Sequence, residues 1–261
     1  MTQPWLFVSP ASRGIGFQLA RRLLRTTNLP VVATSRRKSQ DDVRAQILDG
    51  LDVDKERLDI LDLDVTNEDS VSNAAEHCKS KFSRYSLRLA FCIPGILHPE
   101  KSPMQVDYEN ALLTFQVNAL GPLLLSKYFS PMLPRKSAKL EPIDNLPPSA
   151  VLALMSARVG SISDNALGGW YSYRASKSAV NSIVKSVDIF LRQRCGENAM
   201  CLGLHPGTVK TGLSQDFWSS TPGEKLFSPE FAAEKLHEVV RTMGIKGRGR
   251  CWDWQAKEIP P

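Results

Sequence analysis

The sequence predicts an α/β fold in which a doubly wound parallel β-sheet is covered by helices on both faces. Short apolar runs rich in β-branched residues alternate with helical patterns of roughly 10 to 20 residues, which indicates right-handed β-α-β crossovers between parallel strands. Hydrophobic residues make up 42% of the 261 positions and charged residues 23%, an ordinary usage for a protein with one core. Because no second core follows a linker, we expect one domain over residues 1–261.

The individual elements follow from these patterns in chain order. Six apolar runs are the expected strands: Trp5–Val8, Val31–Thr34, Leu58–Leu61, Leu87–Phe91, Ala150–Met155 and Met200–Leu204. The helices expected between them include Ile15–Leu24, Ser70–Lys81 and Val106–Phe129, and another begins near Tyr171. Residues 134–148 contain four prolines interleaved with charges, so we expect a surface loop there.

Composition also limits the setting of the protein. The apolar runs are far shorter than the roughly 18 to 20 residues that a membrane helix needs. The first residues lack the basic, apolar and small-residue segments of a secretory signal. Five scattered cysteines, none in a Cys-x-x-Cys pair, suit free thiols in a reducing compartment. We therefore expect a cytoplasmic protein without a membrane partner.

Charge and histidine spacing bear on the partners. Lysine and arginine exceed aspartate and glutamate by 33 to 27, giving a net charge of +6. The basic residues concentrate in the ranges 21–22, 36–38 and 135–136, and a nucleic-acid stripe is one interpretation. We favour solvated helix ends for all but the second cluster, and no nucleic-acid partner. The four histidines show no metal-binding spacing, so no metal site is expected.

A glycine-containing turn follows the first strand directly. It leads into an amphipathic helical pattern, and such a turn presents backbone N–H groups and the positive end of a helix dipole to a pyrophosphate. Pro10 stands where a first glycine is expected and can donate no hydrogen bond. The predicted cofactor contacts in this turn are Ser9, Ser12, Arg13, Gly14, Ile15 and Gly16.

Tyr173 and Lys177 are four residues apart, so on a helix their side chains share one face. An adjacent ammonium favours the phenolate and lowers the pKa of a phenol, which is otherwise about 10. The pair is therefore predicted to exchange a proton with a carbonyl or alcohol oxygen, the alternative being a chance pair on a surface helix. The strand that ends near Ser156 favours the first interpretation, because it brings a hydroxyl to the sheet edge where ligands bind.

The chain resembles the short-chain dehydrogenase/reductase family in the order and spacing of five motifs that together cover most of its length. The motifs are the turn ending at Gly14–Gly16, Asp64–Val65 after the third strand, Asn118 within Val117–Pro122, Tyr173 with Lys177, and Pro206–Thr211. Residues 156–173 and 249–260 are similar to the branch of the family that contains the bacterial C-factor and the insect carbonyl reductase called sniffer.

The resemblance implies a Rossmann-type domain that binds NAD(P)(H), with Tyr173 as the proton donor or acceptor. Lys177 would hold the nicotinamide ribose and tune the tyrosine, and Asn118 would support a water relay to the lysine. The resemblance also implies cofactor contacts from the later motifs: Asp64, Val65, Gly95, Asn118, Tyr173, Lys177, Pro206, Gly207, Val209 and Thr211.

The family also implies a serine that hydrogen-bonds the substrate oxygen, and two serines are candidates. Family members usually carry two hydroxyl residues three and four positions before the glycine that is Gly160 here, where this chain has Ser156 and Ala157. Ser156 is one position away from the commoner place and is favoured. Ser161 is the alternative, because the loop from it to Tyr173 is longer than is common. A third reading is that Tyr173 acts without a serine.

The residues after the second strand bear on which dinucleotide binds. NAD-specific domains carry an acidic residue about 20 positions beyond the glycine turn. Arg36 stands at that position here, between Ser35 and Arg37, and a guanidinium with a neighbouring hydroxyl suits a 2′-phosphate. We therefore expect NADP(H) to be preferred over NAD(H), with Arg13 able to share the phosphate. A merely solvated basic turn is the alternative.

The leading hypothesis is an NADP(H)-dependent oxidoreductase that interconverts a small carbonyl compound and a secondary alcohol. A degenerate dinucleotide-binding sensor is the second hypothesis, suggested by Pro10, by Ala157, and by Cys92–Pro94 in place of the family's Asn-Asn-Ala. A lyase or isomerase on the same fold is the third. The segment 212–228, which is rich in aromatic residues, is expected to form a mobile lid that decides the substrate. The sequence also allows a homo-oligomer.

Overall fold

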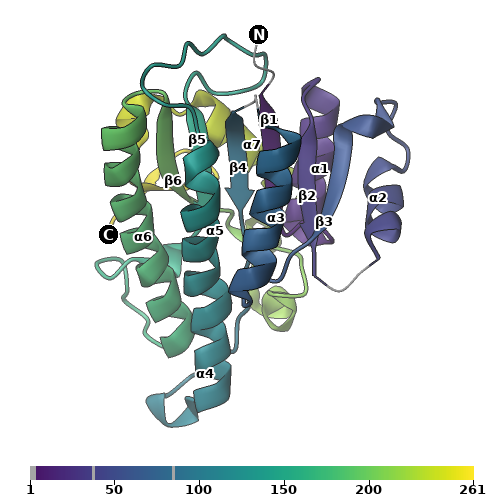
Figure 1. The fold of residues 1–261 in the computed structure, drawn as a ribbon. Helices are drawn as coiled ribbons and strands as arrows, with labels where there is room; N and C mark the ends of the chain where they lie inside the picture. Colours follow the sequence, from purple (N-terminus) through teal and green to yellow (C-terminus); the bar gives the residue numbers. More distant parts are fainter. Residues whose placement is uncertain (1–3, 37–38, 84–85) are drawn as a thin grey trace.

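The computed structural model describes residues 4–36, 39–83 and 86–261. In this part of the chain one sheet of eight strands runs through the molecule in the order β10-β9-β6-β5-β4-β1-β2-β3 (Figure 1). Its strands are β1 (Trp5–Ser9), β2 (Val31–Ser35), β3 (Leu58–Asp62), β4 (Leu87–Cys92), β5 (Ala150–Met155), β6 (Ala199–His205), β9 (Cys251–Asp253) and β10 (Glu258–Ile259). Only β10 pairs antiparallel in this sheet, and the predicted parallel core is confirmed.

Helices cover both faces of the sheet, as a doubly wound fold requires. The helices are α1 (Gly14–Thr26), α2 (Gln40–Leu48), α3 (Glu68–Lys81), α4 (Tyr108–Phe115), α5 (Gly121–Phe129), α6 (Tyr171–Cys195) and α7 (Pro229–Thr242). Figure 1 shows α3, α5 and α6 side by side on one face. Their apolar side chains form one core cluster, whereas α1, α2 and α7 contribute to a second cluster on the other face.

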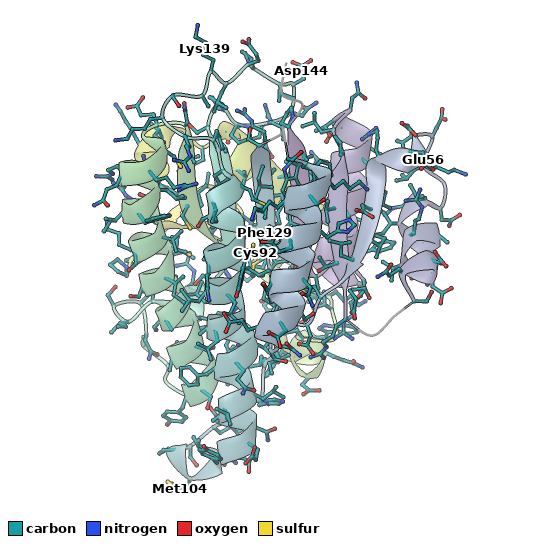
Figure 2. The ribbon with its side chains drawn as sticks, viewed as in Figure 1. Glu56, Cys92, Met104, Phe129, Lys139 and Asp144 are labelled. Atoms are coloured by element: carbon teal, nitrogen blue, oxygen red, sulfur yellow. The ribbon has the colours of Figure 1, made fainter. Side chains whose placement is uncertain are left out.

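The strands alternate their side chains between these two clusters. In β1, Phe7 belongs to the first cluster and contacts Phe129 at 4.2 Å between ring centroids, whereas Leu6 and Val8 belong to the second. Figure 2 places Phe129 and Cys92 in the centre of the molecule. Burying one such aromatic side chain contributes about 1.5 to 3 kcal/mol. Because both faces of the sheet are covered, most strand residues are apolar, which is why the strands could be recognised. Asp59 and Asp62 of the edge strand β3 are exceptions.

The expected helix over Val106–Phe129 is instead divided by a π-helical turn. Asp107 caps α4 by accepting a hydrogen bond from the backbone N–H of Asn110 at 2.9 Å, so α4 begins at Tyr108 rather than at Val106. The π-helical turn Gln116–Leu120 then joins α4 to α5 and contains the buried Asn118. Single π-helical turns inside α-helices are frequent at functional sites.

Residues 134–148 form the loop that the prolines predicted, at the amino-terminal edge of the sheet. Lys139 and Asp144 lie at its outer side in Figure 2, whereas His237 contacts the backbone oxygen of Asn145 at 2.9 Å.

The structure contains two features after residue 206 that the sequence did not predict. Strand β7 (Thr208–Val209) lies just before the predicted lid segment 212–228 and pairs with β8 (Leu226–Phe227), which lies near the end of that segment. Strands β9 and β10 extend the main sheet. The mobility of the lid stays a prediction.

The cysteines, the helices and the exposed apolar side chains bear on the expected compartment and partners of the protein. All five cysteines are buried and free. No helix within the described residues is both long and apolar enough to span a membrane. Exposed apolar side chains gather on α4 and on the turn that follows it: Tyr108, Leu112, Leu113, Phe115 and Leu120. The homo-oligomer stays a prediction.

Candidate active site

The candidate site lies at the carboxyl ends of β1, β4, β5 and β6. Strand order reverses between β1 and β4, since β2 and β3 extend to one side of β1 whereas β4, β5 and β6 extend to the other. In open α/β sheets the crevice outside such a reversal is where ligands bind. The glycine turn after β1 and the start of α6 after β5 both belong to this edge.

The glycine turn has the geometry that close approach of a ligand requires. Gly14 has a φ of 58°, in the left-handed region, and a Cβ on Gly16 would lie 1.9 Å from the carbonyl oxygen of Pro10. Only glycine fits at position 16 without moving backbone. Arg13, the N-cap residue of α1, makes no side-chain cap hydrogen bond, and the first turn holds no acidic residue. The first turn of α1 therefore contributes no carboxylate of its own to compete for the amides at this helix end, which suits a phosphate.

Two segments enclose the turn. The backbone N–H of Ala11 donates to the carbonyl oxygen of Thr34 at 2.7 Å, which ties the turn to β2. On the other side, a Cβ built on Gly14 would meet the Thr211 methyl group at 3.3 Å. The predicted contacts in the turn and in the segment Pro206–Thr211 are therefore brought together, although they are almost 200 positions apart in the sequence.

The residues predicted to select the dinucleotide lie at the end of β2. The Ser35 hydroxyl is buried and has no hydrogen-bond partner within the described ranges, so a polar group remains available there. Arg36 is exposed, and its Nη1 lies 3.8 Å from Oδ1 of Asp64. This contact joins the predicted phosphate residue to the predicted Asp64–Val65 motif. Arg37 lies outside the described residues.

Asn118 connects three parts of the site. Its Oδ1 accepts a hydrogen bond from the backbone N–H of Ile96 at 2.8 Å, and its Nδ2 donates to Ile96 O at 2.9 Å and to Ser176 Oγ at 3.1 Å. The π-helical turn is thereby fixed both to the loop after β4 and to α6. A Cβ on Gly95 would lie 3.8 Å from Lys177 Nζ and 3.9 Å from Asn118 Oδ1, so the predicted Gly95 belongs to the same site.

Tyr173 and Lys177 lie one turn apart on α6, as their spacing predicted. The Lys177 ammonium lies 5.7 Å from the centre of the Tyr173 ring and donates to the carbonyl oxygen of Met155 at 2.8 Å. Both side chains are buried, at 8% and 1% exposure. Burial is the main cause of both pKa shifts: it raises the pKa of Tyr173 to about 12 and lowers that of Lys177 to about 8.

The predicted lowering of the tyrosine pKa is therefore wrong for the protein by itself. A charge in a buried place loses its hydration, and this loss outweighs the attraction between phenolate and ammonium. Burial therefore favours the neutral phenol of Tyr173, whereas Lys177, with its pKa lowered to about 8, is still an ammonium at neutral pH but loses its proton more readily than an exposed lysine. The phenol of Tyr173 is thus a proton donor in its resting form, and loss of its proton requires a further favourable charge or hydrogen bond.

The two candidate serines are both buried, with hydroxyls directed at other partners. Ser156 donates to Oδ1 of Asn181 at 2.6 Å. The Ser161 hydroxyl accepts from the backbone N–H of Asp164 at 3.1 Å and donates to Pro261 O at 3.3 Å. Across the described part of the chain, neither serine hydroxyl hydrogen-bonds to Tyr173. Which serine assists catalysis stays a prediction.

Aromatic side chains line one side of the Tyr173 ring. Trp170 meets Tyr173 edge to face with 6.1 Å between centroids, and it contacts Phe217 of the predicted lid at 4.9 Å. Trp218 instead donates its indole N–H to Ser214 Oγ at 2.9 Å. Trp170 therefore contacts Tyr173, whereas the Trp218 indole is held within the predicted lid segment.

One residue of this region was not predicted. Glu100 lies in the irregular stretch between β4 and α4 and is only 3% exposed, and its side chain contacts the start of α6. A single acidic residue in a loop carries no sequence signal, because its partner is 72 positions away.

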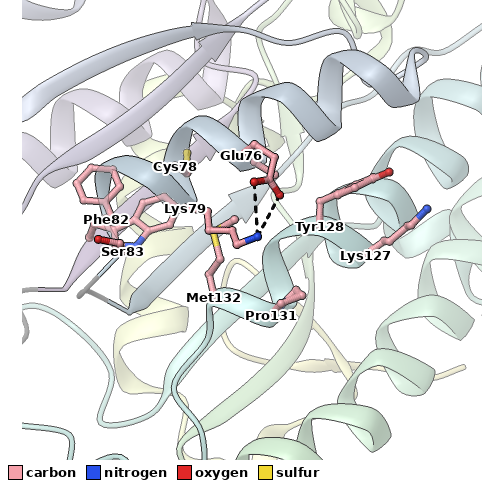
Figure 3. Close-up of a pocket in the computed structure, with 11 residues that line it drawn as sticks. Glu76, Cys78, Lys79, Phe82, Ser83, Lys127, Tyr128, Pro131 and Met132 are labelled. Carbon is pink, nitrogen blue, oxygen red and sulfur yellow. Dashed lines mark hydrogen bonds and ion pairs between the residues drawn. The ribbon is translucent and has the colours of Figure 1, made fainter.

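A separate hollow of about 360 Å³ lies between α3 and α5 (Figure 3). Its lining includes Trp5, which begins β1, so it belongs to the opposite edge of the sheet. Lys79 and Glu76, both on α3, form an ion pair at 3.3 Å on one wall of this hollow. We do not assign this hollow to the candidate site, because it contains none of the predicted residues.

Comparison with known proteins agrees with this geometry. A family model described as enoyl-(acyl carrier protein) reductase matches residues 11–236. The 1-hydroxy-2-glutathionyl-2-methyl-3-butene dehydrogenase of Rhodococcus sp. (strain AD45) is 28% identical over 247 residues, which are 94% of each chain. The C-signal of Myxococcus xanthus is 32% identical over 155 residues, which are 59% of this chain and 81% of the relative.

Solved structures give the same result for the fold. The NADPH-bound carbonyl reductase from chicken fatty liver has a TM-score of 0.83 at 27% identity, with 100% of both chains covered. The carbonyl reductase Sniffer of D. melanogaster has a TM-score of 0.82 at 24% identity, again over 100% of both chains, and shows the shared fold. The family model covers most of the chain, and the motif residues meet at one sheet edge. The chain therefore belongs to the short-chain dehydrogenase/reductase family and is an oxidoreductase.

Proposed function

We propose that this oxidoreductase uses NADP(H) to interconvert a small carbonyl compound and a secondary alcohol. The observation that carries the proposal is the burial of Tyr173 and Lys177 together, beside Gly95 and Asn118, at the edge that also holds the glycine turn. The NADPH-bound carbonyl reductase among the similar structures supports the choice of cofactor class. The test is steady consumption of NADPH, followed by its absorbance, with a panel of ketones and aldehydes.

The dinucleotide fits the residues that are present. The glycine turn would accept a phosphate where a Cβ on Gly16 would collide with Pro10. The Ser35 hydroxyl, which has no hydrogen-bond partner among the described residues, lies at the end of the neighbouring strand. A bound nicotinamide supplies or accepts the hydride. Tyr173 donates its proton to the substrate oxygen in reduction and accepts it in oxidation. Lys177 holds the ribose and stabilises the phenolate, and Asn118 keeps α6 in register with the loop after β4.

The serine assignment leads to the first prediction. If Ser156 hydrogen-bonds the substrate oxygen, Ser156→Ala lowers kcat by about tenfold or more, and Ser161→Ala changes kcat less. Each substitution also removes a buried hydrogen bond, from Asn181 in one case and from Asp164 in the other, so the losses of stability are comparable. Steady-state kinetics on both variants give the ranking. A larger loss of kcat in Ser161→Ala than in Ser156→Ala would assign the role to Ser161. If neither substitution lowers kcat, Tyr173 acts without a serine.

The cofactor preference leads to the second prediction. Arg36 is placed to pair with a 2′-phosphate, for which it would exchange its 3.8 Å contact with Asp64. We expect NADPH to bind at least about tenfold more tightly than NADH, equivalent to about 1.4 kcal/mol, and the NADPH affinity to weaken as salt rises. Arg36→Asp removes or reverses the preference, because a carboxylate repels the phosphate and suits a ribose hydroxyl.

Isothermal titration of both dinucleotides measures this preference. Arg25→Asp is the matched control, since Arg25 is an exposed residue in the last turn of α1, at the far end from the glycine turn. The control should retain the preference of the wild type. Equal affinities in the wild type, or a preference for NADPH that survives Arg36→Asp, would assign Arg36 to the solvated surface.

The second candidate function is a dinucleotide-binding sensor without turnover. It is favoured by the engagement of Ser156 with Asn181 and by Ala157 at the next position, which together leave Tyr173 without a neighbouring hydroxyl hydrogen bond in the described residues. A sensor would bind NADPH in titration yet consume none with any carbonyl compound. Sustained turnover that Tyr173→Phe abolishes would exclude it.

A further inference from the structure

Helix α6 carries both Tyr173 and Lys177, yet its own sequence does not cap its start. The N-cap residue is Trp170, whose φ of 51° and ψ of 47° are left-handed, and whose indole makes no cap hydrogen bond. The first turn contains no acidic residue either. A helix of 25 residues thus begins without the serine, threonine, aspartate or asparagine that usually satisfies its first amides.

The missing cap is supplied by Glu100 from the stretch between β4 and α4. Oε2 of Glu100 accepts a hydrogen bond from the backbone N–H of Ser172 at 2.8 Å, and Oε1 accepts from the Ser172 hydroxyl at 2.5 Å. Both carboxyl oxygens are therefore used by the residue that directly precedes Tyr173. The carboxylate also lies at the positive end of the α6 dipole, where a negative charge is stabilised.

The backbone of Glu100 makes a further hydrogen bond to the start of α6. Its carbonyl oxygen accepts from the backbone N–H of Trp170 at 2.6 Å. A Cβ on Gly169, which has a φ of 68°, would lie 3.4 Å from this oxygen, so the two segments are in close contact. Trp170 in turn meets the Tyr173 ring edge to face. Glu100 thus fixes the residues on both sides of Tyr171 at the start of the catalytic helix.

We propose that Glu100 is a positioning residue, which clamps the first turn of α6 and so sets the place of the Tyr173 hydroxyl and of the Trp170 ring. This inference rests on the proposed function, because the position of Tyr173 matters most if it transfers a proton. Glu100 is 3% exposed, and among the described residues its side chain has no ion-pair partner, so its carboxylate is used to hold Ser172. A displaced hydroxyl lowers the rate steeply, by about 10²-fold for a displacement of about 1 Å.

Two substitutions separate position from charge. Glu100→Gln keeps the length of the side chain: its amide oxygen can accept from Ser172 N, and its amide N–H can donate to the Ser172 hydroxyl. Glu100→Asp keeps the charge but is one methylene shorter, so it cannot hold both groups. We expect kcat within about threefold of wild type for glutamine, a loss of about tenfold or more for aspartate, and a KM for NADPH within about threefold in both.

Hydrogen exchange provides a readout that does not depend on turnover. The backbone N–H of Ser172 should exchange faster in Glu100→Asp than in wild type, and close to the wild-type rate in Glu100→Gln. Asp107→Ala is the matched control, because it removes a carboxylate cap from the neighbouring helix α4. We expect this control to lower the melting temperature while leaving kcat within about twofold and the exchange of Ser172 unchanged.

The outcomes are distinct. Wild-type kcat in Glu100→Asp, or an equal loss in both substitutions, would overturn the positioning role. If wild type consumes no NADPH with any carbonyl compound, the proposed function fails, and the exchange rates alone then decide whether Glu100 clamps α6. Unchanged exchange of Ser172 in Glu100→Asp would overturn the clamp itself.

Discussion

Replacing Tyr173 by phenylalanine is expected to lower kcat by about 10²- to 10⁴-fold while leaving folding and dinucleotide binding nearly unchanged. The substitution removes only the phenolic oxygen, because the ring keeps its edge-to-face contact with Trp170. The resting phenol, whose pKa burial raises to about 12, is the proton donor for reduction, and phenylalanine has no proton to donate. Steady-state turnover and titration with NADPH measure the two parts of this prediction.

Tyr171→Phe is the matched control for this experiment. It makes the same chemical change at the first residue of the same helix, but Tyr171 is 39% exposed and lies off the face that Tyr173 shares with Lys177. The control is expected to stay within about threefold of the wild-type rate. A Tyr173→Phe protein that retains activity within about tenfold of wild type would exclude the assigned proton transfer.

Replacing Lys177 by methionine is expected to raise the stability of the dinucleotide-free protein while removing most of its activity. Burial lowers the pKa of Lys177 from 10.5 to about 8, so the ammonium is held at a cost of about 3 kcal/mol at neutral pH. Methionine has a similar length and no charge, and it avoids this cost. Part of the gain is offset because the carbonyl oxygen of Met155 loses its donor. Turnover should fall about 10²-fold or more.

The difference in the free energy of unfolding between wild type and Lys177→Met is expected to depend on pH. Between pH 8 and 10.5 the unfolded chain holds a proton on Lys177 that the folded chain has lost, so the free energy of unfolding of the wild type rises with pH in this window relative to the variant. The advantage of Lys177→Met is therefore full below pH 8 and disappears above 10.5. Urea unfolding at pH 7, 9 and 10.5 measures it.

The matched control is Lys185→Met, which makes the same change at an exposed position of the same helix. It should change stability by no more than about 0.5 kcal/mol at any of these pH values. A Lys177→Met protein that is less stable than wild type at pH 7 would show that the hydrogen bond to Met155 outweighs the cost of the buried charge.

The strands and most helices could be predicted because their signals are local. Ala150–Met155 is both the predicted strand and β5, and all six of its residues are apolar and buried, as is typical of a strand covered on both faces. The division of the expected helix 106–129 could not be predicted in the same way. The π-helical turn at Gln116–Leu120 is held by hydrogen bonds from Asn118 to Ile96 and Ser176, which are distant in the sequence.

The motif residues show the same distinction. The family resemblance identified Tyr173, Lys177 and Asn118, because their residue types and spacing recur as patterns. The predicted shift of the Tyr173 pKa had the wrong direction. The spacing of the two residues predicts the neighbouring ammonium, but it does not predict that the ring is buried. The orientation of Ser156 toward Asn181 was likewise hidden, because it depends on how β5 packs against the middle of α6.

The sequence by itself thus determined strands β1 to β6, helices α1, α3 and α6, the glycine turn, and the spacing of Tyr173 and Lys177. Each of these depends on residues that are close together along the chain. Only the tertiary structure decided which buried hydroxyls are already engaged and that Glu100 caps the start of α6. The physical reason is the same for both. Hydrogen bonds of buried polar groups are set by whatever backbone and side chains the packing brings within about 3 Å, and their partners follow no period in the sequence.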